Sequence, residues 1–336
     1  MDMPSQKLIE LLRQSESGKQ RLFNGDPVRY LTHDAYCKYC QQQWYLIAGH
    51  GDGRYVALRN DAEMEQLIHQ IQNGRAREDI LAGLKSQEIN AVSLDQARED
   101  ACVNSINLAA RLLLMLKFGV VKHEAVPKGY LSWEKGALAD FVRDYFSSNP
   151  VLSCDRVRLP KTFNAWSLES IAGIEVNFTD NLADHLRLVD DDSKVLVFHH
   201  ASFLECHLQD SMFPDRFAHE TLSTLALLFP QSIFSRSHGH RLARSKRKWF
   251  QALLARQEHW AIDPRLVLCG DLQMEDRQIE RFVYWRDRLV ILKQAYDDAT
   301  PRTLSQWWLD RRNGVQWYTF WVAILVLIIT TVLSVV

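Results

Sequence analysis

Cysteine is scarce in this sequence. There are six cysteines among 336 residues, and only Cys37 and Cys40 lie close together. Small extracellular domains that depend on disulfides carry more cysteines over a much shorter length. The sequence therefore argues against a disulfide framework and predicts reduced thiols. We accordingly expect the N-glycosylation triplet Asn177-Phe178-Thr179 to stay unmodified.

A secretory signal and a strong net charge are also lacking. Met1 to Leu22 has charged residues through its only apolar cluster, so it has no long apolar core. The formal net charge is −1, and no predicted helix of the first half has the basic face that phosphate contacts require. These absences argue against secretion and against a nucleic-acid partner. A familiar catalytic motif is missing too, which leaves enzymatic activity undecided and favours a non-enzyme.

One long hydrophobic run is present, from Trp317 to Val336. It contains no charge, proline or glycine. A helix of this length, at about 1.5 Å per residue, matches the roughly 30 Å hydrocarbon core of a bilayer. A buried core helix is expected to be shorter and to carry polar interruptions. The run therefore predicts a single transmembrane helix, and its place at the end of the sequence is typical of a tail anchor.

The residues beside this run predict its orientation. Basic residues precede it and none follows it, so the positive-inside rule keeps residues 1 to 316 in the cytosol. Aromatic rings gather at the same edge, where indole and phenol groups favour the membrane interface. The endoplasmic reticulum is favoured over the mitochondrial outer membrane. The predicted interface residues are Trp307, Trp308, Arg311, Arg312, Trp317, Tyr318 and Trp321.

The rest of the chain predicts an α+β fold that is mostly α-helical, a cytosolic helical region with small β elements. The predicted segments are an N-terminal segment (1–26), an α-rich subdomain with a β-hairpin (27–150), an α+β subdomain that ends in a long helix (151–300), a juxtamembrane amphipathic helix (301–316) and the transmembrane helix (317–336).

In the first half, Trp44 to Ala48 and Arg54 to Leu58 flank a glycine-rich stretch and predict a β-hairpin. Helical spacing follows, and a proline after Asn149 breaks the pattern. The predicted helices are Asp61 to Ile71, Arg75 to Leu84, a longer helix from Ser93 to about Lys117, and Ser132 to Phe146.

In the second half, Ile174 to Phe178 and Val195 to Phe198 are rich in β-branched and aromatic residues and predict two strands of a small sheet. Apolar stripes then predict helices. These are Ala201 to Leu208, Asp215 to Phe229, Arg241 to Trp260 and Met274 to Tyr296. A short amphipathic helix begins at Thr303.

Two constellations suggest chemistry. Cys37 and Cys40, with His33 and His50, are the ligand types of a tetrahedral zinc site, but there is no second cysteine pair, so reduced thiols are favoured and no cofactor is predicted. His199, His200 and Glu205 follow a predicted strand, where enzyme sites are often built. No nucleophile elbow accompanies them, so a polar strand end that caps the next helix is favoured.

The most concentrated charge is basic. Arg241, Arg244, Arg247 and Lys248 lie on one predicted helix, opposite apolar residues. Such a face is usually solvated, but beside an anionic leaflet each basic residue contributes about 1 kcal/mol. We predict a membrane lipid and a protein as partners. Thr330 and Ser334 in the apolar run also leave homo-oligomerisation open.

Several stretches resemble an uncharacterised family of filamentous-fungal proteins. They are Phe163 to Trp166, Thr179 to Leu186, Phe198 to Glu205, and the Trp-Trp-Leu-Asp-Arg-Arg-Asn and Trp-Tyr-Thr-Phe-Trp motifs between Thr303 and Trp321. The resemblance implies a membrane-tethered cytosolic protein and no particular activity.

The sequence thus predicts a tail-anchored membrane protein with a cytosolic binding or scaffold region. One alternative is an enzyme with a site near His199, His200 and Glu205. The other is a subunit of an ion transporter, because a long helix that leads into a C-terminal span resembles CorA-type magnesium channels in outline. Their second span and Gly-Met-Asn motif are missing here.

Overall fold

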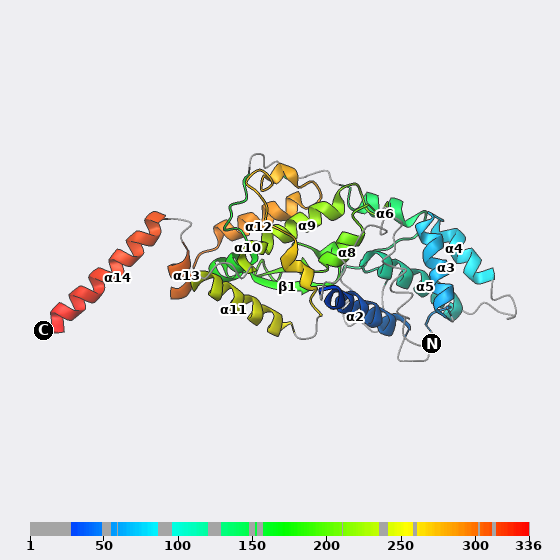
Figure 1. The fold of residues 1–336 in the computed structure, drawn as a ribbon, viewed down its shortest axis with the longest axis horizontal. Coiled ribbons are helices and arrows are strands. Elements are labelled where there is room, and N and C mark those ends of the chain that lie inside the picture. The colour runs from blue at the N-terminus through cyan, green and yellow to red at the C-terminus, as the bar shows by residue number, and fades with distance from the viewer. Residues whose placement is uncertain are drawn as a thin grey trace.

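The computed structural model describes residues 28–48, 55–58, 60–86, 96–119, 129–147, 152, 157–209, 211–234, 241–257, 261–301, 303–310 and 314–335. Helices predominate, with a small three-stranded sheet and an apolar C-terminal helix, so the predicted fold class is confirmed. Figure 1 shows an elongated molecule with α2 to α6 toward one end and α14 projecting from the other. The predicted N-terminal segment (1–26) lies outside the described residues.

The N-terminal half is built around α5 (Gln96–Leu114). Every residue from Ser105 to Leu114 is buried, because α2 (Val28–Ala48), α3 (Asp61–Gln72) and α4 (Arg77–Ser86) pack on it. Tyr36 and Tyr39 of α2 donate their hydroxyls to backbone carbonyls near the end of α5, at 2.6 and 3.0 Å. These bonds join two helices that are far apart in the sequence.

The predicted β-hairpin at Trp44 to Leu58 is wrong. Trp44 to Ala48 form the last turn of α2. Cys40, Trp44 and Ile47 are buried and recur at helical spacing, so the apolar pattern continues that of the helix. Tyr55 to Leu58 form a short segment without strand pairing, and the glycine-rich stretch before it lies outside the described residues.

α6 (Leu138–Tyr145) begins six residues after the predicted start at Ser132. A turn occupies the intervening segment and depends on Gly136, whose φ of +74° favours glycine. The Gly136 carbonyl accepts from the amide of Arg77 and its own amide donates to Glu78, both at 3.0 Å. The segment therefore covers the start of α4 instead of extending α6.

The sheet has the order β1-β3-β2. β1 (Glu175–Thr179) pairs in parallel with β3 (Lys194–Phe198), and β2 (Arg187–Val189) pairs antiparallel with β3. β1 and β3 confirm the two predicted strands. β2 was not predicted, because its three residues are all half-buried and show no alternation.

Helices and short turns surround the sheet. The α-helices are α7 (Ala165–Ser167), α8 (Ala201–Cys206), α9 (Phe217–Leu228), α10 (Gln231–Phe234), α11 (Arg241–Arg256) and α12 (Arg286–Asp298), and the tighter or wider turns are η1 (Leu168–Ala172), η2 (Leu182–Asp184), η3 (Pro264–Leu268) and η4 (Ile279–Arg281). The apolar core continues into the N-terminal helices, since Phe203 of α8 stacks on Tyr36 with ring centroids 5.8 Å apart.

The predicted helix from Met274 to Tyr296 is wrong in its first half, since α12 begins only at Arg286. Glu220 of α9 holds the preceding segment in another conformation. Its carboxylate accepts from the amides of Val283, Tyr284 and Trp285, each at 2.8 Å. A buried acceptor for three successive donors fixes the start of α12 and replaces the helical hydrogen bonds there.

The chain leaves the folded body through α13 (Leu304–Leu309) and ends in α14 (Gly314–Val335). Thr303 caps α13: its hydroxyl accepts from the amide of Gln306, and the Gln306 side chain accepts from the amide of Thr303. α13 packs on η1, whereas α14 extends away from the body (Figure 1).

We predict that Glu220→Gln lowers the free energy of unfolding by about 1–3 kcal/mol, because an amide NH2 group then faces a backbone donor in a buried site. Chemical denaturation of the full chain in detergent micelles, followed by tryptophan fluorescence, measures the change. Glu275→Gln, at an exposed glutamate, is the matched control. Equal stability of the two variants would contradict the role given to Glu220.

Candidate functional site

The first candidate functional feature of the protein is the apolar surface of α14. Trp317 to Ser334 is long and apolar enough to cross a membrane, and none of these residues is buried against the protein. The hydroxyls of Thr330 and Thr331 donate to carbonyls one turn earlier in the same helix, at 2.9 and 2.7 Å. These polar groups are therefore satisfied within the helix and need no water.

The predicted interface aromatics form a collar at the start of α14. Trp307 stacks on Phe320 with centroids 4.4 Å apart, and Trp308 meets Trp321 edge-on at 5.0 Å. The Trp317 indole donates to the carbonyl of Trp308 at 3.4 Å. The collar thus joins α13 to α14. Tyr318 is exposed and contacts Trp317 edge-on, while Arg311 and Arg312 lie outside the described residues.

The predicted basic helix is α11. Arg244 and Lys248 are exposed and Arg247 is partly exposed, and within the described part of the chain none of the three forms an ion pair; the side chain of Arg241 is not described. The opposite face holds α11 on the body through buried Leu253 and through Phe250, whose ring lies 4.8 Å from Phe234.

The sheet places Asp180 beside the predicted histidine pair. β1 and β3 run parallel, with Thr179 opposite Phe198 in the register. The next residues on the two strands, Asp180 and His199, therefore meet at the same edge of the sheet. His199 Nε2 lies 3.1 Å from Asp180 Oδ1, and His200 Nε2 lies 2.6 Å from the same oxygen.

Asp263 fixes the orientation of His199. The Asp263 amide donates to His199 Nδ1 at 3.3 Å, so the proton of the neutral ring lies on Nε2 and points to Asp180. The Asp263 carboxylate accepts from the amide of Ser202 at 2.7 Å and so caps α8. His200 is the N-cap residue of α8, as the favoured interpretation expects, but its side chain makes no cap hydrogen bond, and Asp263 supplies that bond instead.

Burial sets the protonation of this cluster. Burial and the neighbouring His200 lower the pKa of His199 to about 4. Burial raises the pKa of Asp180, but the two imidazole hydrogen bonds outweigh it and leave that pKa below the ordinary value. At neutral pH the cluster is therefore an Asp180 carboxylate that accepts from neutral His199.

Asp180, His199 and His200 are also the ligand types of a metal site, and their ligand atoms lie within 4.8 Å of one another. The hydrogen bonds of His199 do not fit that use. A ligating imidazole must offer a lone pair on the coordinating nitrogen and usually donates from its other nitrogen. In His199 the outer nitrogen accepts, so the nitrogen that faces Asp180 carries the proton. The geometry favours a structural cluster.

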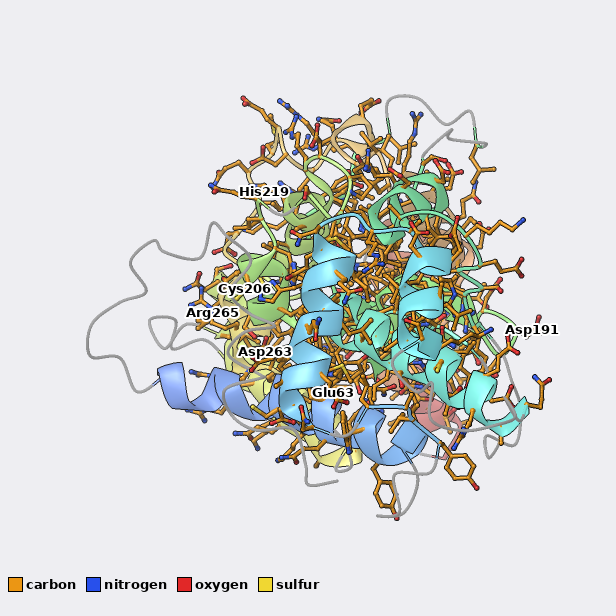
Figure 2. The ribbon with its side chains drawn as sticks, turned by 90° about the vertical axis from the view of Figure 1, so that its right-hand side faces the viewer. Glu63, Asp191, Cys206, His219, Asp263 and Arg265 are labelled. Carbon is orange, nitrogen blue, oxygen red and sulfur yellow. The ribbon has the colours of Figure 1, made fainter. Side chains whose placement is uncertain are left out.

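Glu205 does not join the histidines. Its carboxylate binds the Arg265 guanidinium, with Nε 3.1 Å from Oε2. Figure 2 shows Arg265 and Asp263 beside α8, near Cys206. The three residues proposed as a catalytic group are therefore not one constellation, and Asp180 supplies the acid instead of Glu205.

The cysteine pair lies on α2, where Cys40 is fully buried and Cys37 is half-buried. Neither forms a disulfide. The side chain of His33 and all of His50 lie outside the described residues, so the zinc site stays a prediction.

Asp180 is the residue that sequence reasoning missed, because it lies 19 residues before His199 and carries no motif of its own. A parallel pairing of the two predicted strands was the available signal, since parallel neighbours bring their carboxyl ends to one edge.

Comparison of the chain with protein-family models, with curated proteins and with solved structures finds no match.

The cluster predicts acid sensitivity. Because the pKa of His199 is lower in the folded protein than in the unfolded chain, the unfolded chain takes up the proton at a higher pH. The contribution of His199 to the free energy of unfolding is therefore fully present above about pH 6.5 and is lost as the pH falls toward 4. Between pH 7.5 and 5 we expect His199 to lower the free energy of unfolding by about 2 kcal/mol. Denaturation at the two pH values measures it.

His199→Asn keeps a donor and an acceptor but does not titrate in this range. It should therefore reduce the decrease in the free energy of unfolding between pH 7.5 and 5. A residual slope is expected, because burial lowers the pKa of His185 as well. His219→Gln, at an exposed histidine labelled in Figure 2, should leave the slope unchanged. An unaltered slope in His199→Asn would refute the assignment.

Proposed function

We propose that this protein is anchored in a membrane by α14, with its folded region in the cytosol, where that region binds a partner at the membrane surface. The observation that carries the proposal is the surface of α14. Trp317 to Ser334 is long and apolar enough to span a bilayer, and none of these residues is buried inside the protein. An apolar surface of this size in water strongly disfavours the soluble state.

The aromatic collar indicates how deeply α14 enters the membrane. The rings of Trp307, Trp308, Trp317 and Trp321 gather at the end of α14 that meets the body. Tryptophan prefers the boundary between headgroups and acyl chains. The collar therefore lies at the interface, and the body lies immediately outside it.

The orientation rests on charge and thiols. Arg311 and Arg312 precede the span, and basic residues beside a span favour the cytosolic side, which supports a cytosolic body. The described cysteines form no disulfide, as expected for the cytosol. Tail anchoring, the endoplasmic reticulum as the membrane, and membership of the fungal family that the sequence resembles belong to the same proposal.

α11 supports a binding role. Figure 1 places α11 and α13 at the same end of the body, the end from which α14 leaves. Arg244, Arg247 and Lys248 are thus near the membrane side of the protein, where an anionic leaflet attracts basic side chains. We propose this face as the contact for acidic lipid headgroups. An acidic protein surface would use the same charges.

The two alternatives have less support. The enzyme hypothesis required Glu205 beside the histidines, and Glu205 pairs with Arg265 instead. The transporter hypothesis requires a pore, and within the described residues a single helix is able to span the membrane.

The first test is membrane integration. The full chain expressed in cells should stay in the membrane pellet after alkaline carbonate extraction, whereas a chain that ends at residue 302 should be released. Introducing charge by Leu325→Lys and Ile329→Lys in α14 should also release the protein, because each central lysine costs about 2.5–3.5 kcal/mol on insertion.

The orientation needs an added glycosylation tag after Val336. The natural triplet at Asn177 is uninformative, because Asn177 lies in β1 and its side chain bonds Gln257. The C-terminal tag should be glycosylated and the body should be digested by added protease. A protected body with an unmodified tag would contradict the proposed orientation.

The second test concerns α11. A chain that ends at residue 302 should bind vesicles that contain phosphatidylserine. Reversing Arg244, Arg247 and Lys248 to glutamate should weaken binding at least about tenfold, since each basic residue contributes about 1 kcal/mol. Circular dichroism first checks that the variant is folded. Vesicle sedimentation at low and high salt then measures its affinity for the vesicles.

The control reverses Arg75, Arg98 and Lys135, which are exposed and lie in the N-terminal helical half. It changes the net charge by the same amount and should leave binding near the wild-type level. Equal loss in both variants would mean that net charge, and not α11, determines the affinity.

A further inference from the structure

A cavity of about 460 Å³ lies in the N-terminal helical half, between α2, α4, α5 and the segment before α6. It opens to solvent, and none of its lining residues belongs to α14 or to the histidine cluster. Its walls include two arginines, two acidic residues and several aromatic rings. Those used in the argument are Arg77, Asn107, Arg111, Trp133, Asp100 and Glu134.

The two arginines differ in their partners. Arg111, only 2% exposed, donates from Nε and Nη2 to the carbonyls of Phe118 and Gly119, each at 2.7 Å, and from Nη1 to Gln43 at 3.0 Å. All three of its nitrogens are engaged with the protein. Arg111 therefore holds together α5, α2 and the chain after α5.

Arg77 is 7% exposed and is incompletely paired. Its Nη2 donates to Asn107 Oδ1 at 3.0 Å, and its guanidinium lies over the Trp133 ring, 5.0 Å from the centroid. Its Nη1 is buried and has no hydrogen-bond partner among the described residues. Within the described residues no carboxylate forms a salt bridge with it. Burial lowers the pKa of Arg77, and the more distant Glu134 opposes that shift only in part.

A buried cation without a counter-ion is costly, and proteins usually pair such a group or bind an anion with it. Guanidinium recognises planar oxyanions through paired N–H donors. We propose that this cavity binds a small organic carboxylate and that Arg77 is its counter-ion.

The other walls narrow the class of ligand. Asp100 and Glu134 would repel a doubly charged anion and would attract a cationic or hydrogen-bond-donating group. Leu46, Ile47, Phe118 and Leu131 add apolar surface. The ligand is therefore a molecule with one carboxylate, an apolar part and a donor group, as in an apolar amino acid. The volume lies within the range of ordinary small-molecule sites.

The test uses the full chain in detergent micelles, with 5-fluorotryptophan as a reporter. The probes are L-phenylalanine, 3-phenylpropanoate, 2-phenylethylamine and phenyl phosphate, compared at constant ionic strength. L-Phenylalanine and 3-phenylpropanoate should shift the fluorine resonance of Trp133, identified by its loss in Trp133→Phe, and should raise the thermal midpoint. The amine, which lacks a carboxylate, should do neither.

Asn107→Asp is the decisive variant. It is isosteric and puts a carboxylate on the oxygen position that already accepts from Arg77. The built-in anion should raise the thermal midpoint of the ligand-free protein by at least about 3 °C and abolish the response to 3-phenylpropanoate. Arg77→Lys keeps the charge but loses the planar fork, so it should weaken binding at least tenfold.

Arg75→Gln removes an exposed arginine that does not line this cavity and should respond like the wild type. Should Asn107→Asp fail to fold, Arg77→Met decides: it removes the cation and should abolish the response. The proposal is overturned if the amine or phenyl phosphate alone produces the response, if no probe does, or if Arg77→Met responds like the wild type.

Discussion

Parallel pairing of β1 with β3 is the constraint on which the C-terminal half depends. The register sets Thr179 against Phe198 and so delivers Asp180 to His199 at one edge of the sheet. Asp263 then holds the other side of His199 and caps α8 with its carboxylate. One strand pairing thus positions three segments, and burial of the cluster makes a shift of register costly, because a buried carboxylate would lose its donors.

The anchor is coupled to this body through short elements with paired polar groups. The capping box of Thr303 and Gln306 fixes the start of α13, and α13 packs on η1. The stacking of Trp307 on Phe320 then orients the first turns of α14 relative to α13. This coupling fixes the direction of α14 relative to the body, so the proposed membrane anchor has a defined position relative to α11.

Sequence reasoning succeeded where one strong local signal sufficed. The apolar run gave α14, the capping pattern at Thr303 gave α13, and β-branched runs gave β1 and β3. It failed where a distant partner decided the local structure. Glu220, which lies on α9, delays the start of α12 by accepting from three amides of the segment before it. The packing of Trp44 and Ile47 against the core keeps them in α2. Asp180 and Arg77 were missed for the same reason, since their environments come from segments far apart in the sequence.

Buried polar groups in this protein fall into two kinds, and the difference bears on function. Arg111, His199 and Asp263 engage nearby donors and acceptors from the chain itself, so folding alone explains their positions. Arg77 is also buried, yet among the described residues its Nη1 has no hydrogen-bond partner. The chain supplies an acceptor for every nitrogen of Arg111, so this part of the fold does not lack acceptors. The unpaired nitrogen of Arg77 therefore needs another explanation. The second arginine is therefore explained better by a group that the chain does not supply.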